Sequence, residues 1–191
     1  MKKSDRTRKK IIDTFYALNE CQTGKLCTVS EICAKMDISV STFYCHFSGI
    51  REILELESDS LMRYISEAAG QIQEPEQLST GGFTMTREKM FAIIRLAYSR
   101  RRETLLLMRP ELDLPFRSYL RALVIEGVNA ALIALPSQTR SYVVEFMTAG
   151  IMTDMDKWLR EQDMSPEEFV DILFSLENTV ILTSKKVLSK R

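Results

Sequence analysis

The sequence predicts an all-α protein of about nine helices, in which a three-helix N-terminal head is joined to a larger C-terminal bundle. Apolar residues recur at the spacing of amphipathic helices almost throughout, and no segment sustains the alternation of a half-buried strand. The 7 glycines and 5 prolines fall mostly between these stripes, where helices are expected to end. Residues 1–50 are expected to form the head and residues 51–191 the remainder.

The first two helices are defined by an apolar stripe and by a capping signal. A helix at about 5–20 carries a stripe that includes Ile11 and Phe15. Thr28 and Glu31 then have the spacing of a capping box, in which a Thr side chain and a Glu three residues later satisfy the first free amides. The second helix is therefore expected to start after Thr28 and to end near Met36.

A turn, a third short helix and a longer fourth helix follow. Asp37 occupies the turn, where a left-handed backbone is tolerated by Asp. Ser39 is a natural cap for the third helix, and an apolar stripe carries the fourth helix to about Ala69. The glycines and proline of residues 70–86 predict an irregular connection.

About five helices are expected after this connection, one of them at roughly 137–162. The last begins with Ser165, Pro166 and Glu168, which combine a cap residue, a proline at the first helical position and a capping-box glutamate. Its apolar stripe covers more than one side.

Composition excludes several classes of protein. The 191 residues are 45% apolar and 27% charged, which excludes collagen-like and mostly disordered chains. The longest uncharged run, residues 127–139, is too short for a membrane span of about 20 residues, and no secretory signal is evident. We therefore expect a soluble, cytoplasmic protein that makes no membrane contact.

The charges and cysteines narrow the function further. The chain is neutral overall, but residues 1–10 carry six basic residues against one acidic residue, as expected of a nucleic-acid-facing region or of a solvated terminus. The four cysteines match no zinc-site spacing and are expected to be free thiols, with redox sensing as the alternative. With a single His and no phosphate loop, neither an enzyme, a cofactor nor a metal site is expected.

The segment 28–47 carries the functional signal. Two short helices separated by a turn form the helix-turn-helix layout, whose second helix can enter the major groove of DNA. The second of these helices opens with short side chains that allow close approach to base edges, and they are Ser39, Val40, Ser41 and Thr42.

The same residues resemble the signature of the TetR family of transcriptional regulators. The match lies in Thr28-Val-Ser-Glu-Ile-Cys33, in Ile38-Ser-Val-Ser-Thr-Phe-Tyr-Cys-His-Phe47 and in Arg51-Glu-Ile-Leu54, and it covers about 11–56. The resemblance implies that Thr28, Tyr44 and His46 contact phosphate, that 39–42 lie nearest the bases, and that Phe43 and Phe47 are core. A mainly structural role is the alternative for Tyr44 and His46.

Three positions depart from the family pattern. Asp37 replaces the usual Gly of the turn, and Ser41 occupies a position that is usually small. Ile50 replaces a Lys at the start of the fourth helix, so Arg51 beside it is the candidate for that phosphate contact. The sequence leaves open whether Asp37 and Ile50 weaken DNA binding.

The second half is expected to bind a small apolar effector and to dimerise, as the resemblance implies. Met-rich helices suit a permissive pocket, although each Met also fits an ordinary core. The candidate lining residues are Tyr98, Met108, Phe116, Tyr119, Phe146 and Met147. The candidate dimer residues are Tyr142, Gly150, Met155, Phe169, Leu173, Leu176 and Val180. A basic run at 100–102 with Arg95 is expected to be a solvated face, with an anionic effector as the alternative.

The leading hypothesis is a homodimeric repressor that binds a palindromic operator in double-stranded DNA and is released by its effector. The alternative is a TetR-like activator or coactivator controlled by a protein partner, whose bundle would hold no real cavity. The sequence does not identify the effector, the operator or the regulated genes.

Overall fold

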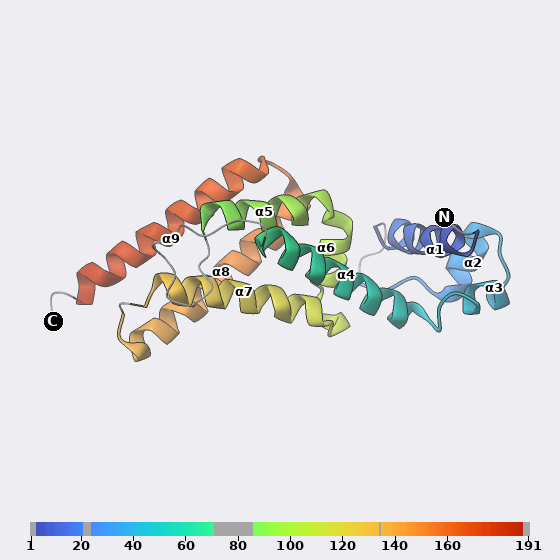
Figure 1. Cartoon of the computed structure of the whole chain (residues 1–191), viewed down its shortest axis with the longest axis horizontal. Coiled ribbons are helices and arrows are strands. Elements are labelled where there is room, and N and C mark those ends of the chain that lie inside the picture. Colours follow the sequence, from blue (N-terminus) through green and yellow to red (C-terminus); the bar gives the residue numbers. More distant parts are fainter. Residues whose placement is uncertain (1–2, 21–23, 71–85, 134, 189–191) are drawn as a thin grey trace.

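The computed structural model describes residues 3–20, 24–70, 86–133 and 135–188, and it is built from helices (Figure 1). The head contains α1 (Lys3–Glu20), α2 (Val29–Met36) and α3 (Val40–Tyr44), and α4 (Ile50–Gly70) leaves it toward the body. The body contains α5 (Arg87–Ser99), α6 (Arg101–Leu107), the 3-10 turn η2 (Pro110–Leu112), α7 (Pro115–Ala131), α8 (Ser137–Glu161) and α9 (Pro166–Leu188). The all-α class and the head-and-bundle layout are confirmed.

The head is held together by apolar side chains from all three of its helices. Ile11 and Phe15 of α1, Ile32 of α2 and Phe43 of α3 are each completely buried. Phe47, just after α3, lies 6.0 Å from the ring of Phe43, so both aromatic residues belong to the core as the sequence predicts. Burial of large side chains of this kind supplies most of the stability of so small a unit.

Asn19 fastens the end of α1 to the segment before α2. Its amide donates to the Phe15 carbonyl at 2.7 Å, and its carbonyl oxygen accepts from the backbone N–H of Cys27 at 3.0 Å. The side chain is buried, so these bonds satisfy polar groups that would otherwise be costly to desolvate. The thiols of Cys27 and Cys33 are free and buried, whereas that of Cys45 is free and exposed.

Helix α4 belongs to the cores of both parts. Ile53 and Leu54 are buried on the head side, and Leu61, Ile65 and Ala69 are buried further along the helix within the same continuous apolar cluster. The start of α4 is fixed by Glu52, which accepts from the Ser48 backbone N–H at 2.6 Å. The division after residue 50 stays a prediction, because this helix is continuous with the head core.

The body is a bundle in which α7 packs on α8 and α9 packs on α5 (Figure 1). Trp158 of α8 is stacked between Tyr98 of α5, at 5.2 Å, and Phe169 of α9, at 4.4 Å. Its indole N–H donates to the Met164 carbonyl at 3.0 Å, which ties the α8–α9 turn to the core. The body therefore has an aromatic centre close to the end of α8 that faces the head.

The expected helix limits agree closely with the structure. The helix expected at 137–162 is α8, and the start predicted for the last helix is confirmed, since the Ser165 N–H donates to Glu168 at 2.8 Å. Of the irregular connection expected at 70–86, residues 71–85 lie outside the described residues. None of the described helices has both the length and the apolarity needed to cross a membrane.

Candidate nucleic-acid interface

The predicted capping box opens α2. The Thr28 hydroxyl accepts from the Glu31 N–H at 3.3 Å, and Glu31 accepts from the Thr28 N–H at 2.6 Å. These bonds hold the pKa of the exposed Glu31 carboxyl below its usual range, the backbone bond from Thr28 having the largest effect. Thr28 is exposed at the helix N-terminus, where the partial positive charge of the helix dipole favours a phosphate group.

The turn between α2 and α3 has the left-handed backbone expected for Asp37, with φ 52° and ψ 49°. Its N–H bonds back to the last turn of α2, and its carboxylate side chain is exposed. The angle between the two helices therefore depends on a backbone conformation that is less costly for Gly than for Asp.

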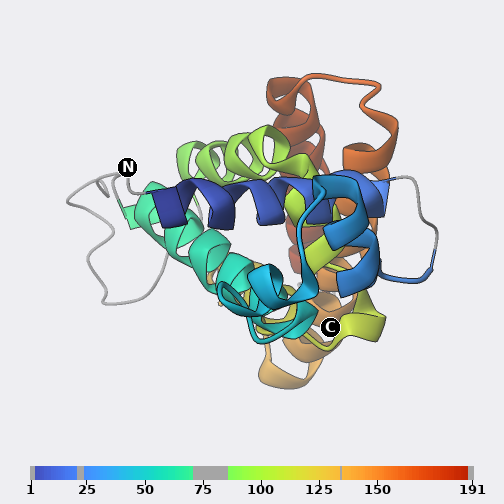
Figure 2. The same cartoon turned by 90° about the vertical axis from the view of Figure 1, so that its right-hand side faces the viewer.

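Helix α3 exposes one side and buries the other. Ser39 caps it by accepting from the Thr42 N–H at 3.0 Å, and the two hydroxyls are 2.8 Å apart. Val40, Ser41 and Tyr44 are exposed, whereas Phe43 is fully buried. Seen end-on from the head, α3 lies at the outer surface of the molecule (Figure 2). The helix thus presents short side chains and one phenol to solvent.

His46 follows α3 and is half-buried, and its backbone carbonyl is anchored by Arg8 of α1. The Arg8 guanidinium donates to that carbonyl at 2.7 Å, lies 4.1 Å from the centre of the Phe47 ring and pairs with Glu52 at 3.5 Å. Arg8 was not among the residues singled out from the sequence. Because Arg8 and His46 are 38 positions apart, no local pattern indicates this contact.

Arg51, the candidate for a phosphate contact, bonds to groups of α4 and of the body, and its role at DNA stays a prediction. Its guanidinium donates to Glu55 at 2.7 Å and to the backbone carbonyls of Leu112 and Asp113 at 2.9 and 3.3 Å. Arg51 therefore bridges the start of α4 to the end of η2 in the body. The neighbouring Ile50 is half-buried against the apolar core.

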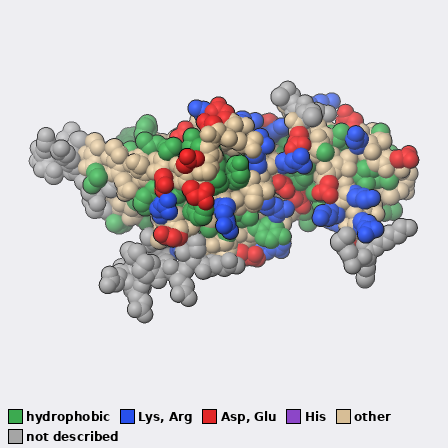
Figure 3. All heavy atoms as spheres, turned by 90° about the horizontal axis from the view of Figure 1, so that it is seen from above, with side chains coloured by type: hydrophobic (Ala, Val, Ile, Leu, Met, Phe, Trp, Pro, Cys, Tyr) green, Lys and Arg blue, Asp and Glu red, His purple; other side chains and the backbone are tan. Residues whose placement is uncertain are grey.

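Basic and acidic side chains alternate over the face seen in Figure 3, on the head as well as on the body. On the head, Lys9, Lys10, Lys25 and Lys35 are exposed, and so are Asp13, Glu31 and Asp37. Within the described residues no group of His, Cys, Asp and Glu side chains could hold a metal ion. The chemistry available at the outer end of the head is therefore hydrogen bonding by hydroxyls and helix amides, supplemented by scattered cations.

The structure does not gather the six candidate ligand residues into one site. Tyr98 stacks on Trp158, Phe116 is completely buried in the core, and Met147 is buried in a second, smaller cluster. Tyr119 is half-buried, and burial raises the pKa of its phenol. Phe146 is 73% exposed, so in the single chain it lies apart from the buried residues. Met108 lines a cleft that is bordered by α7 and α8.

Two hollows are relevant to ligand binding. The apolar cavity lies inside the bundle between α5, α7, α8 and α9, is lined by residues such as Met90, Ile94 and Met155, and has a volume of only about 60 Å³. The polar cleft lies along residues 108–111, α7 and α8 and has a volume of about 600 Å³. Small-molecule sites commonly occupy 300–1,000 Å³, so of these two hollows the polar cleft has that capacity and the apolar cavity does not.

The candidate dimer residues separate into two groups. Met155, Phe169 and Leu173 are buried within the single chain, where packing inside the bundle already covers them. Val180 is half-buried. Tyr142, Gly150 and Leu176 are exposed, and so is Phe146, which lies one turn after Tyr142. Sequence periodicity could not separate the two groups because α9 is apolar on more than one side.

No protein-family model matches the chain, and no curated protein matches it. A TetR transcriptional regulator from Streptococcus agalactiae has a similar structure, with a TM-score of 0.62 at 16% identity over 91% of this chain and 94% of that one. A TetR-family regulatory protein from Rhodococcus gives 0.59 at 15% identity, over 95% and 98%. The dihydroxyacetone kinase operon activator DhaS gives 0.54 at 14% identity, over 93% and 97%. The chain therefore has the TetR-like fold over nearly its whole length.

Proposed function

We propose that this chain is a TetR-like transcriptional regulator that binds double-stranded operator DNA through α2 and α3. The observation that carries the proposal is the exposed side of α3, where Val40, Ser41 and Tyr44 face solvent on a helix capped by Ser39. A helix at the outer end of a helix-turn-helix head can enter a major groove about 12 Å wide. The likeness of the fold to known regulators supports the same function and argues against an enzyme.

In this proposal Ser39, Val40, Ser41 and Thr42 lie nearest the base edges. Hydroxyl and methyl contacts discriminate bases less sharply than a bidentate arginine does, so part of the specificity comes from positioning on the phosphates. Thr28, Tyr44 and His46 supply those positioning contacts, because a phenol and an imidazole N–H can each donate to a phosphate oxygen. Such a protein acts in the cytoplasm, where the DNA is.

The regulator acts as a homodimer. Two α3 helices must reach major-groove faces about 34–36 Å apart, and a symmetric pair of chains meets that requirement on a palindromic operator. Tyr142 and Phe146 of α8 and Leu176 of α9 are 74%, 73% and 53% exposed, an exposure that favours burial against a second copy. Gly150 of α8 lets a partner backbone approach closely.

Repression released by a small molecule is the regulatory mode that we favour. The effector must have a higher affinity for the arrangement that cannot bind DNA than for the arrangement that can. A ligand with equal affinity for both arrangements would not change their populations. Of the six lining residues predicted, Met108 faces a hollow of sufficient volume. We therefore place the effector in the polar cleft.

One observation favours the second candidate, an activator or coactivator controlled by a protein partner. The bundle interior holds an apolar cavity of only about 60 Å³, which is far below the volume of an ordinary ligand site. One structure of similar fold is that of a protein described as an operon activator. A protein partner would then dock on the exposed side chains of α8 and α9.

Footprinting of the DNA that flanks the coding sequence tests the proposal. The purified protein should protect a near-palindrome, with an affinity that falls steeply as salt rises. Tyr44→Phe should weaken binding about tenfold by removing a donor to a charged phosphate, without loss of stability. Tyr64→Phe, at an exposed tyrosine on α4, is the matched control and should bind like the parent. A flat salt dependence, or equal binding to all sequences, would contradict the proposal.

A further inference from the structure

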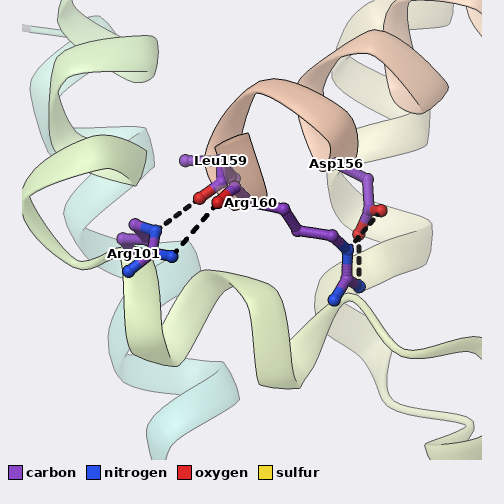
Figure 4. Close-up of polar contacts among 4 residues, drawn as sticks. All are labelled: Arg101, Asp156, Leu159 and Arg160. Carbon is purple, nitrogen blue, oxygen red and sulfur yellow. Dashed lines mark hydrogen bonds and ion pairs between the residues drawn. The ribbon is translucent and has the colours of Figure 1, made fainter. Parts of the chain in front are cut away.

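The polar cleft combines cationic, apolar and unsatisfied polar groups. Four arginines line it, together with three carboxylates, and the arginines are Arg109, Arg117, Arg121 and Arg160. Two of the arginines are neutralised, because Arg121 pairs with Glu145 and Arg160 forms a two-bond pair with Asp156 at 2.8 and 2.9 Å (Figure 4). The cleft therefore carries an excess of positive charge.

The Arg117 side chain forms no ion pair with another described residue. It is exposed in the first turn of α7, a helix that begins with Pro115 and has neither an acidic residue in that turn nor a side-chain cap. A helix N-terminus favours negative charge, so a cation there is unfavourable until an anion joins it. The local electrostatics at this end of the cleft thus favour an anionic group.

Thr148 supplies an independent indication. It lines the cleft and is 1% exposed, and its hydroxyl has no hydrogen-bond partner among the described residues. A buried hydroxyl without a partner is unfavourable, and a bound acceptor reached by rotation about χ1 would satisfy it. Beside it, Met108, Ala149 and Met152 form an apolar wall.

We propose that the polar cleft binds a small amphiphilic anion, a carboxylate or phosphate group that carries an apolar body. The anionic group pairs with Arg117 and accepts from Thr148, and the apolar body lies against Met108 and Met152. This site is distinct from the apolar cavity inside the bundle. Its role as the effector site rests on the proposed function, whereas the binding itself rests on the cleft alone.

The walls of the cleft are joined to the head, which explains how an occupant could act on DNA binding. The stretch from Met108 to Glu111 lines the cleft and continues into Leu112 and Asp113, whose carbonyls accept from Arg51 of α4. At the other end, Arg101 of α6 donates to the carbonyls of Leu159 and Arg160 (Figure 4). Gly24 of the head also lines the cleft.

The test uses the full chain labelled at its methionine methyl groups. Octanoate and octyl phosphate are the anionic probes, octanol and octylammonium are the matched neutral and cationic probes, and inorganic phosphate tests the head group alone. The anionic probes should shift the methyl resonances of Met108 and Met152 but not those of Met90 and Met155, which line the apolar cavity. Octanol and octylammonium should bind at least about tenfold more weakly.

Two variants sharpen the test. Arg117→Gln should weaken octanoate binding about tenfold, and Thr148→Val should weaken it about threefold without loss of folding. Arg95→Gln, an exposed arginine on α5 outside the cleft, should bind octanoate like the parent. Shifts confined to Met90 and Met155, equal binding of octanol, an unchanged affinity in Arg117→Gln, or no binding at millimolar concentrations would each overturn the proposal.

These readouts require no DNA, so the two proposals can fail separately. If octanoate reaches Met108 and Met152 but no palindrome is protected, the regulator assignment falls and the anion site stands. If DNA is bound but no anionic probe shifts these methyl groups, the anion site falls and the regulator assignment stands.

Discussion

The guanidinium of Arg51 donates to the backbone carbonyl of Leu112 at 2.9 Å, which joins the first turn of α4 to the turn beside the polar cleft. A second bond from the same group reaches the Asp113 carbonyl at 3.3 Å. Charged donors form the stronger class of hydrogen bond, and the planar arginine group can serve both carbonyls at once. Head and body are thus connected by a polar contact as well as by the continuous helix α4.

The first prediction separates this bridging role from a phosphate contact. Arg51→Ala should leave the salt dependence of DNA binding unchanged, because the guanidinium is already bonded to two backbone carbonyls of the body. Each phosphate contact that is lost lowers the slope of log K against log salt by about 0.9. Filter binding over a salt series measures this slope. Glu55→Ala is the control, because it keeps the bonds from Arg51 to the end of η2. A slope for Arg51→Ala that is smaller in magnitude by about 1 or more would show that Arg51 contacts a phosphate.

The second prediction compares two buried threonines. Thr148→Val should stabilise the protein by about 1 kcal/mol, because valine has the same shape and removes a hydroxyl without a partner. Thr104→Val should destabilise it by about 1 kcal/mol, because the Thr104 hydroxyl is bonded to the Arg100 carbonyl at 2.9 Å. Urea unfolding of both variants gives the two values. A destabilised Thr148→Val variant would show that the Thr148 hydroxyl has a partner.

The third prediction concerns Asp37 in the turn of the head. Asp37→Gly should stabilise the protein by about 0.5–1 kcal/mol, since Gly adopts φ 52° at lower cost, and it should raise DNA affinity by removing a carboxylate near the phosphates. Asp113→Gly changes the same residue type at φ 46°, after η2, and should change stability alone. Thermal melts and gel-shift titrations separate the two effects. Unchanged DNA affinity in Asp37→Gly would show that this carboxylate points away from the DNA.

The fourth prediction is a pH dependence at the junction of head and body. Burial raises the pKa of Glu57 above its usual range, assisted by the nearby Glu103 carboxylate and opposed by the attraction of Arg100. The folded chain therefore holds this proton more tightly than the unfolded chain, so the contribution of Glu57 to stability falls as pH rises through its folded pKa. Glu57→Gln removes the titrating group and should be more stable than the parent at neutral pH, with a smaller difference at acidic pH.

Urea unfolding as a function of pH measures this effect. Glu67→Gln, an exposed position on the same helix, is the control and should follow the parent curve. A parent and a Glu57→Gln variant with parallel stability curves would exclude a buried ionisation at Glu57.

The fifth prediction concerns assembly. Phe146→Glu together with Leu176→Glu should shift the protein from dimer to monomer, because two charges would have to be buried at the proposed interface. Both side chains are exposed in the single chain, so the monomer should stay folded. Sedimentation velocity gives the mass, and circular dichroism checks the helices. Leu56→Glu, an exposed leucine on α4, should leave the dimer intact; a dimer that survives the double change would place the interface elsewhere.

Local signals in the sequence determined the head and the start of the last helix in detail. The Thr28–Glu31 and Ser165–Glu168 capping boxes, the Ser39 cap and the left-handed Asp37 all join groups within four residues of one another. Interactions of so short a range are encoded by residue type and spacing, and tertiary packing does not have to be known to recognise them. The expected helices and the buried Phe43 and Phe47 follow from the same periodic patterns.

Tertiary structure alone decided which cations face solvent and where space remains. Arg8 and Arg51 find backbone carbonyls that are 38 and 61 positions away, and such carbonyls carry no residue identity that a sequence pattern could signal. The burial of Met155 and Leu173, the exposure of Phe146 and the volume of the polar cleft likewise depend on how whole helices pack. Helical periodicity identifies an apolar side of a helix, but the packing of the bundle determines whether that side meets its own core, a ligand or a second chain.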